Sequence, residues 1–188
     1  AEPGYEHKET QPTGAAAAAA GGFTDVMILP NTNPAMSGKA VVEYIQQKAA
    51  ALPVTIHTVA AITKNVEGKE LGEMYDMSQS GALAFSDGTQ SIQSPGLLLK
   101  ALQYVLPLGA TVIQVPDDKS ISAHGLMNEG IVSTQLGLPG KPAIAEELMI
   151  ARDIELLRYT GSKLHITGVS TKKGIELLSQ GKSGQLGV

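Results

Sequence analysis

The chain has 188 residues, a formal net charge of -4, 43% hydrophobic residues and no cysteine. Its length fits one domain with a sizeable core, its composition argues against disorder, and the lack of cysteine excludes disulfides and thiolate metal ligands. The mild acidity argues against binding to nucleic acid. No apolar run approaches the ~20 residues of a membrane helix, which argues against a membrane segment. The polar start of the chain is unlike a secretory signal, so we expect a cytoplasmic protein.

Strand and helix signals alternate along the chain. An alanine-rich helix over 14–20 should end at Gly21, and Ser37 is a candidate N-cap for a helix reaching about Leu52. A Ser- and Gly-rich insert over 117–139 interrupts the alternation, with one helical turn predicted around Leu126. The predicted strands are 23–29, 54–60, 82–86, 110–115 and 163–167. The other predicted helices are 67–80, 97–106 and 143–159, and a last helix begins with residues 172–179.

This alternation predicts a parallel sheet. One alternative is a doubly wound open sheet of about five strands. The other is part of a (β/α)8 TIM barrel, which usually needs ~250 residues and eight strands. Because a five-strand arc leaves two open edges and an uncovered inner face, the barrel alternative predicts that residues 1–188 form a single incomplete domain. The missing strands would come from other residues or from another chain.

Both architectures place functional side chains in the loops that follow the strands. After the first strand, Asn31 and Asn33 lie between two prolines and offer amide donors for a carboxylate or an amide-rich ring; an Asx-turn is the simpler interpretation. After the third strand, Asp87 could be a metal ligand or a general base, although Asp-Gly is also a common turn.

Later loops offer further candidates. Asp117 and Asp118 could bind a metal or act in acid–base chemistry, but the lysine that follows favours a solvated turn or a helix start. His165 has apolar strand neighbours, which favours a core histidine over a ligand. The chain has no pair of histidines at zinc-site spacing, no G-x-S-x-G motif and no P-loop. The residues alone therefore indicate candidates and no assembled catalytic centre.

Several motifs, taken in order along the chain, resemble class I dihydroorotases of the amidohydrolase superfamily. They are E-P-G-Y-E-H-K-E at 2–9, A-A-A-G-G-F-T at 18–24, P-N-T-N-P at 30–34, F-S-D-G at 85–88, N-E-G at 128–130, A-E-E-L-M-I-A-R-D at 145–153 and V-S-T-K at 169–172. The resemblance implies a (β/α)8 barrel, of which this chain supplies about five βα units. It also implies zinc-dependent interconversion of carbamoyl aspartate and dihydroorotate in pyrimidine biosynthesis.

The resemblance further implies where the metal ligands should stand, and this chain departs from the family there. The family's metal-bridging aspartate corresponds to Gly88, one histidine ligand to Val115 and another to Gly168, with the family's spacing preserved. None of these residues has a donor atom in its side chain, so no metal is expected, whereas an intact site would hold zinc. Asp87 and His165 survive beside two of these positions as weak candidates for a shifted site.

At the positions where the family binds its substrate, this chain matches the family at one residue and departs from it at another. Asn31 matches the family's substrate-binding asparagine, with Asn33 a weaker candidate, whereas Ala1 stands at the position of the family's substrate arginine.

The favoured hypothesis is a catalytically silent dihydroorotase homologue. The resemblance to such degenerate homologues implies a homo-oligomer and a structural role beside aspartate transcarbamoylase. The alternatives are an active dihydroorotase or related cyclic amidohydrolase with an altered metal site, and an unrelated doubly wound small-molecule binder.

Overall fold

The computed structural model describes residues 2–184 and 186–188, and its centre is a curved parallel sheet. The strands are β1 (Asp25–Ile28), β2 (Thr55–Ala60), β3 (Ala82–Ser86), β4 (Thr111–Gln114) and β7 (Leu164–Ile166). Each predicted strand is confirmed to within two residues. Neighbours in the sheet follow chain order, and every pair is parallel.

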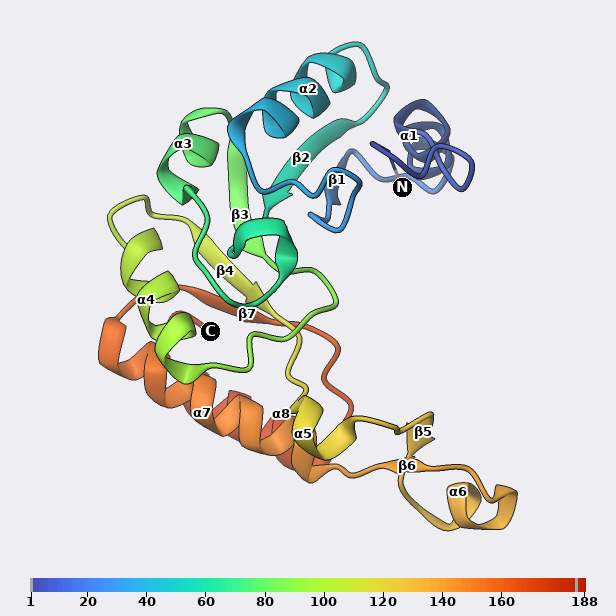
Figure 1. The fold of residues 1–188 in the computed structure, drawn as a ribbon, viewed down its shortest axis with the longest axis vertical. Helices are drawn as coiled ribbons and strands as arrows, with labels where there is room; N and C mark the ends of the chain where they lie inside the picture. The colour runs from blue at the N-terminus through green and yellow to red at the C-terminus, as the bar shows by residue number, and fades with distance from the viewer. Residues whose placement is uncertain (1, 185) are drawn as a thin grey trace.

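This strand order decides between the two predicted architectures. A doubly wound sheet reverses its strand order at a switch point, but here the order runs β1-β2-β3-β4-β7 without reversal. The sheet also curls, as Figure 1 shows. The doubly wound alternative is therefore wrong, and the fold is an arc of a TIM barrel, as the favoured interpretation predicted.

Helices cover the outer side of this arc (Figure 1). The main ones are α1 (Gln11–Ala20), α2 (Lys39–Ala49), α3 (Met74–Gln79), α4 (Pro95–Val105), α7 (Ile144–Thr160) and α8 (Lys172–Ser183). The core lies between the sheet and these helices, where Phe85, Leu98, Leu102 and Leu157 are fully buried. Burial of each such side chain contributes roughly 1.5–3 kcal/mol, so this single layer of contacts holds the strands at fixed positions.

The inner face of the sheet carries exposed apolar side chains. Met27 is 52% exposed, although its neighbours Val26 and Ile28 pack against the core, and alternation between the two faces of a strand therefore places it on the concave side. Leu83 is 49% exposed where the register between β2 and β3 shifts. Beyond β7, Lys163 forms an isolated parallel bridge with Gly187, so the tail begins to extend the sheet at that edge.

Several predicted helix boundaries were wrong, and among them α1 begins three residues before the predicted range and α2 ends at Ala49 instead of near Leu52. The helix predicted over 67–80 is limited to α3, preceded by a short 3-10 turn, η1 (Lys64–Val66). The residues between them fold back on the end of β2 instead: the Gly72 N–H donates to the Ile62 carbonyl at 2.8 Å, and Thr63 bridges Leu71. Ser37 is not the cap of α2, because the extended residue before Lys39 is Gly38.

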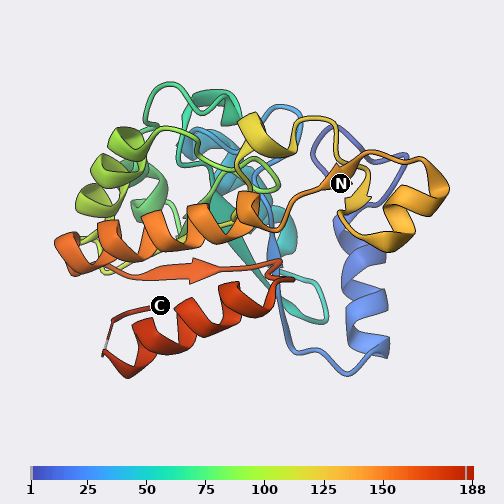
Figure 2. The same cartoon turned by 90° about the horizontal axis from the view of Figure 1, so that it is seen from below.

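The insert after β4 is more structured than predicted. It contains α5 (Lys119–Ser122), β5 (Met127–Asn128), α6 (Ile131–Leu136) and β6 (Gly140–Lys141). Leu126 lies between α5 and β5, where its N–H donates to the Pro139 carbonyl at 3.0 Å, so the helical turn predicted there was wrong. We call residues 126–141 the arm, and Figures 1 and 2 both show it reaching beyond the helices. Within the described ranges, no helix is long and apolar enough to span a membrane.

One buried ion pair lies within α7. Asp153 is fully buried and accepts from Arg152 Nε at 2.7 Å, while Arg152 also donates to the carbonyls of Ile92 and Gln93 at 3.0 and 2.9 Å. The second Asp153 oxygen, Oδ2, has no partner among the described residues. Burial raises the pKa of Asp153 to about 6, although the neighbouring Arg152 charge opposes this shift.

The raised pKa predicts a specific pH dependence. A carboxyl group with a folded pKa above its unfolded value stabilises the fold while protonated, and this contribution is lost as the pH rises from about 4 to about 6. We therefore expect Asp153→Asn to exceed the parent in free energy of unfolding by about 3 kcal/mol at pH 7.5 and to match it closely near pH 4. Urea denaturation at both pH values measures this difference, with the exposed Asp76→Asn as the control. An equal difference at the two pH values would contradict the assignment.

Candidate functional site

The three expected ligand positions, Gly88, Val115 and Gly168, follow neighbouring strands at the carboxyl edge of the sheet. Val115 comes directly after β4, whereas Gly88 and Gly168 come two residues after β3 and β7. A Cβ atom built on Gly168 would lie 3.9 Å from Val115 Cγ1, and one built on Gly88 would lie 3.4 Å from Asn31 Cγ. The structure thus brings Val115 to Gly168 and Asn31 to Gly88, at the edge where TIM barrels carry their active sites.

The two asparagines of the first loop have different surroundings. Asn31 lines a cavity of about 550 Å³, which it shares with Tyr5, Lys8, Thr32, Ala35, Asn65, Val66, Thr89 and Gln90. Asn33 contacts the N-terminal segment, where its backbone N–H donates to the Pro3 carbonyl at 3.0 Å. Of the two, Asn31 is therefore the one that faces a space large enough for a small molecule.

Asp87 is bonded to the loop that follows β2. Its Oδ1 accepts from the N–H groups of Ile62 and Thr63 at 2.9 and 3.0 Å, and its Oδ2 accepts from the Thr63 hydroxyl. Burial raises the pKa of Asp87, and these hydrogen bonds offset part of that rise. Both oxygens are thus used within the chain, and the carboxylate joins the ends of β2 and β3.

His165 lies on the concave face of the sheet and is exposed, in register with Ile113 of β4. The expectation of a buried core histidine was wrong. Its neighbour Leu164 is 2% exposed and packs in the core, and alternation along the strand therefore turns His165 to the opposite face.

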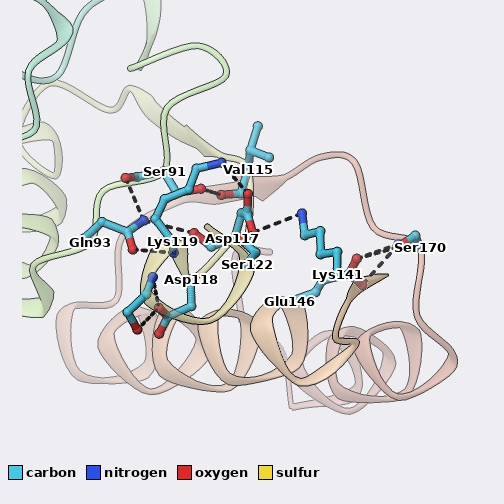
Figure 3. A network of polar contacts seen from close by, with 11 residues as sticks. Ser91, Gln93, Val115, Asp117, Asp118, Lys119, Ser122, Lys141, Glu146 and Ser170 are labelled. Atoms are coloured by element: carbon cyan, nitrogen blue, oxygen red, sulfur yellow. Dashed lines mark hydrogen bonds and ion pairs between the residues drawn. The ribbon is translucent and has the colours of Figure 1, made fainter. Parts of the chain in front are cut away.

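A polar network after β4 is shown in Figure 3. Asp117 is only 6% exposed, and it pairs with Lys119 at 2.5 Å and Lys141 at 3.0 Å and accepts from the Ser122 hydroxyl at 2.6 Å. Burial pushes the pKa of Asp117 upward, but these partners outweigh it and hold the pKa below its usual value. The solvated turn predicted for Asp117 was wrong, whereas the helix start is confirmed because Asp118 caps α5.

The same network joins the loops after β3 and β4. The Ser91 hydroxyl donates to the Val115 carbonyl, and Gln93 Nε2 donates to the Asp117 carbonyl at 2.9 Å. The Lys119 N–H in turn donates to Gln93 Oε1 at 2.9 Å. The backbone at Val115 is therefore fixed by contacts with the preceding loop, and no local sequence pattern indicated these partners.

Glu146 fixes the loop after β7. This carboxylate is 4% exposed and accepts from the N–H groups of Ser170 and Thr171 at 3.0 and 2.9 Å and from both hydroxyls at 2.7 Å. Burial raises the pKa of Glu146, but the four donors outweigh burial and lower the pKa overall. Thr171 caps α8, because its hydroxyl accepts from the Gly174 N–H.

These residues do not fit a zinc ion. Zinc needs nitrogen, oxygen or sulfur ligands at about 2.0–2.3 Å, and the side chains of Gly88, Val115 and Gly168 supply none. In residues 2–184 and 186–188, no group of three or more His, Cys, Asp or Glu side chains could hold a metal. Ala1, the position of the substrate arginine, lies outside the described residues.

Curated relatives and solved structures agree with this fold and sequence pattern. The chain is 47% identical over 182 residues to a dihydroorotase of Pelotomaculum thermopropionicum, which covers 97% of this chain and 43% of the relative. It is 43% identical over 182 residues to a dihydroorotase of Syntrophus aciditrophicus, covering 96% of this chain and 43% of the relative. The chain thus spans less than half the length of these relatives.

A likeness to solved structures supports the fold alone. The L-hydantoinase (dihydropyrimidinase) from Arthrobacter aurescens superposes with a TM-score of 0.71 at 22% identity, over 93% of this chain and 40% of that one. A family model described as dihydro-orotase-like matches residues 1–174. Because this match covers most of the chain, and relatives above 40% identity cover nearly all of it, the chain belongs to the dihydroorotase family.

Proposed function

We propose that this protein is a non-catalytic dihydroorotase homologue of pyrimidine biosynthesis, with a degenerate metal site. The observation that carries the proposal is the identity of three positions at the carboxyl edge of the sheet, Gly88, Val115 and Gly168. They follow adjacent parallel strands, and none has a donor atom in its side chain. In this family zinc supplies an activated water at neutral pH, and three absent ligands cannot be replaced by outer groups that only orient ligands.

A structural role is consistent with how the chain uses its remaining carboxylates. Asp87, Asp117 and Glu146 are each less than 7% exposed and bonded to neighbouring loops. Catalytic groups commonly keep an unsatisfied or exposed atom for the substrate, whereas these groups hold one loop to the next. The edge that carries chemistry in other barrels is thus built here as a rigid surface.

The arm supports a role in binding another protein. Leu126, Ile131 and Leu136 are 71%, 78% and 61% exposed, and exposed apolar groups on a projecting element are typical of interfaces. We propose that the partner is aspartate transcarbamoylase, which the family resemblance suggests, and that the protein acts as a homo-oligomer in the cytoplasm. Size-exclusion chromatography with light scattering should give a joint complex that Ile131→Ser with Leu136→Ser abolishes, while the far-side variant Tyr75→Ser leaves it intact.

The catalytic part of the proposal has a direct test. We expect the purified protein, after dialysis against a buffer that contains zinc, to hold far less than one bound zinc per chain by elemental analysis. We also expect it to show no turnover of dihydroorotate above the rate in buffer alone. A metal-replete dihydroorotase from Pelotomaculum thermopropionicum is the positive control. Stoichiometric zinc together with turnover would overturn the proposal.

A second candidate function is an active cyclic amidohydrolase with an altered site. The observation in its favour is Asn31, which matches the family's substrate asparagine and lines the cavity of about 550 Å³. An Asn31→Ala variant separates the two candidates. If the parent shows activity, the second candidate predicts that the variant loses most of it, whereas the proposed function predicts that both proteins are silent.

A further inference from the structure

We infer that the metal site is closed by the backbone as well as by the missing side chains, because Gly88 and Gly168 are held in conformations that favour glycine. The inference rests on the proposed function and extends it. Gly88 has a φ of 65° and Gly168 a φ of 76°, in the left-handed region that residues other than glycine rarely adopt. Restoring the family's side chains would therefore not by itself restore the site.

The turn at Gly88 is fixed on both sides. The Gly88 N–H donates to Ser86 Oγ at 3.0 Å, and the Gln90 N–H donates to the Asp87 carbonyl at 3.1 Å. The Asp87 side chain is bonded to Ile62 and Thr63. A change to negative φ at Gly88 would break several of these bonds, so a substituted residue must accept the left-handed conformation.

The turn at Gly168 is fixed in the same way. On one side, the Thr167 N–H donates to the Gln114 carbonyl at 3.0 Å. On the other, the Ser170 N–H donates to Glu146 at 3.0 Å. Thr167 directly precedes Gly168, and only one residue lies between Gly168 and Ser170. The φ of Gly168 therefore cannot change without moving either β7 or the start of α8.

At each position one neighbouring side chain lies within contact distance of a built Cβ atom. A Cβ on Gly88 would touch Asn31 Cγ at 3.4 Å and Asn31 Cβ at 3.6 Å. A methyl group fits there in ordinary contact, whereas we expect the larger carboxylate of an aspartate to compete with the Asn31 amide for this space. A Cβ on Gly168 would point within 3.9 Å of Val115 Cγ1, so a ring at 168 must share space with position 115.

The chain offers a matched control for backbone strain. Gly109 has the same φ of 65° as Gly88 but nothing within 4 Å of a built Cβ. We expect Gly88→Ala and Gly109→Ala to lower the folding equilibrium constant alike, by roughly 5- to 30-fold, because both suffer only the left-handed strain. Gly88→Asp should lower it at least 5-fold more than Gly109→Asp, and adding Asn31→Ala should remove that excess. No effect of Gly88→Ala, or no excess for Gly88→Asp, would overturn the inference.

Zinc binding gives the second measurement. The triple variant Gly88→Asp, Val115→His, Gly168→His carries three potential ligands, the number found in catalytic zinc sites. We expect a zinc titration to shift its melting temperature no more than that of the parent. A saturable rise at one zinc per chain would overturn the inference while leaving the proposed function intact; zinc and turnover in the parent would overturn the proposed function instead. If the triple variant does not fold, the comparison of Gly88 with Gly109 still decides.

Discussion

Asp87→Ala should lower the free energy of unfolding by about 4 kcal/mol. The carboxylate accepts from two backbone N–H groups and one hydroxyl at a site where it is 1% exposed. Removing it takes the acceptor from the buried Thr63 N–H and hydroxyl and leaves the Ile62 N–H only its longer bond, 3.3 Å, to the Ser86 carbonyl. Each buried group that loses its partner is destabilising by about 1–3 kcal/mol. Urea denaturation followed by circular dichroism measures the change.

Two controls separate this role from the mere loss of a charge. Asp87→Asn keeps an oxygen for the two N–H groups, and its amide can donate to the Thr63 hydroxyl, so we expect it to lose no more than about 1 kcal/mol. The exposed Asp76→Ala should change stability by less than about 0.5 kcal/mol. If Asp87→Asn were as unstable as Asp87→Ala, the hydrogen bonds would not be the cause.

Glu146→Ala should lower the free energy of unfolding by a similar amount, about 3–4 kcal/mol. The variant removes the acceptor for Ser170 and Thr171, and these two residues begin α8. Hydrogen exchange should therefore increase most in the first turn of α8. The neighbouring Glu147→Ala, which removes an adjacent acidic side chain without this contact, is the control.

The pH dependence of the same contact has the opposite sign to that of Asp153. The pKa of Glu146 is lowered in the fold, so its contribution is fully present above the unfolded value near 4.5 and is lost as the pH falls through the folded value. The gap in stability between the parent and Glu146→Gln should thus shrink as the pH falls from 6 to about 3. A gap that grows over this interval would refute the lowered pKa.

Local patterns predicted the strands well and the polar contacts poorly. The strand over 82–86 was predicted at its true bounds because its apolar run lies between turn residues. In contrast, Asp117 meets Lys141, and Glu146 meets Ser170. Each pair is 24 residues apart in the sequence, and no spacing rule connects such positions. Only the fold brings α7, the arm and the loop after β7 together.

The misplaced residues also have a physical explanation. His165 was expected in the core because its neighbours are apolar, but apolar side chains lie on both faces of a barrel strand, and sequence does not say which face the helices cover. The helix over 67–80 was overestimated because its periodicity continued upstream, while the backbone there bonds to the end of β2. The expected ligand positions, by contrast, came from the family resemblance, and they lie at the carboxyl ends of three neighbouring strands.

The strand order of the sheet has a consequence for how the protein is made. Each strand from β2 to β4 pairs with the strand just before it in the chain, so no early strand waits for a distant partner. Contacts that are short in sequence form quickly, and domains begin to fold during synthesis. The arc can therefore grow by one strand and one helix at a time as the chain leaves the ribosome, with its growing edge advancing from β1 toward β7.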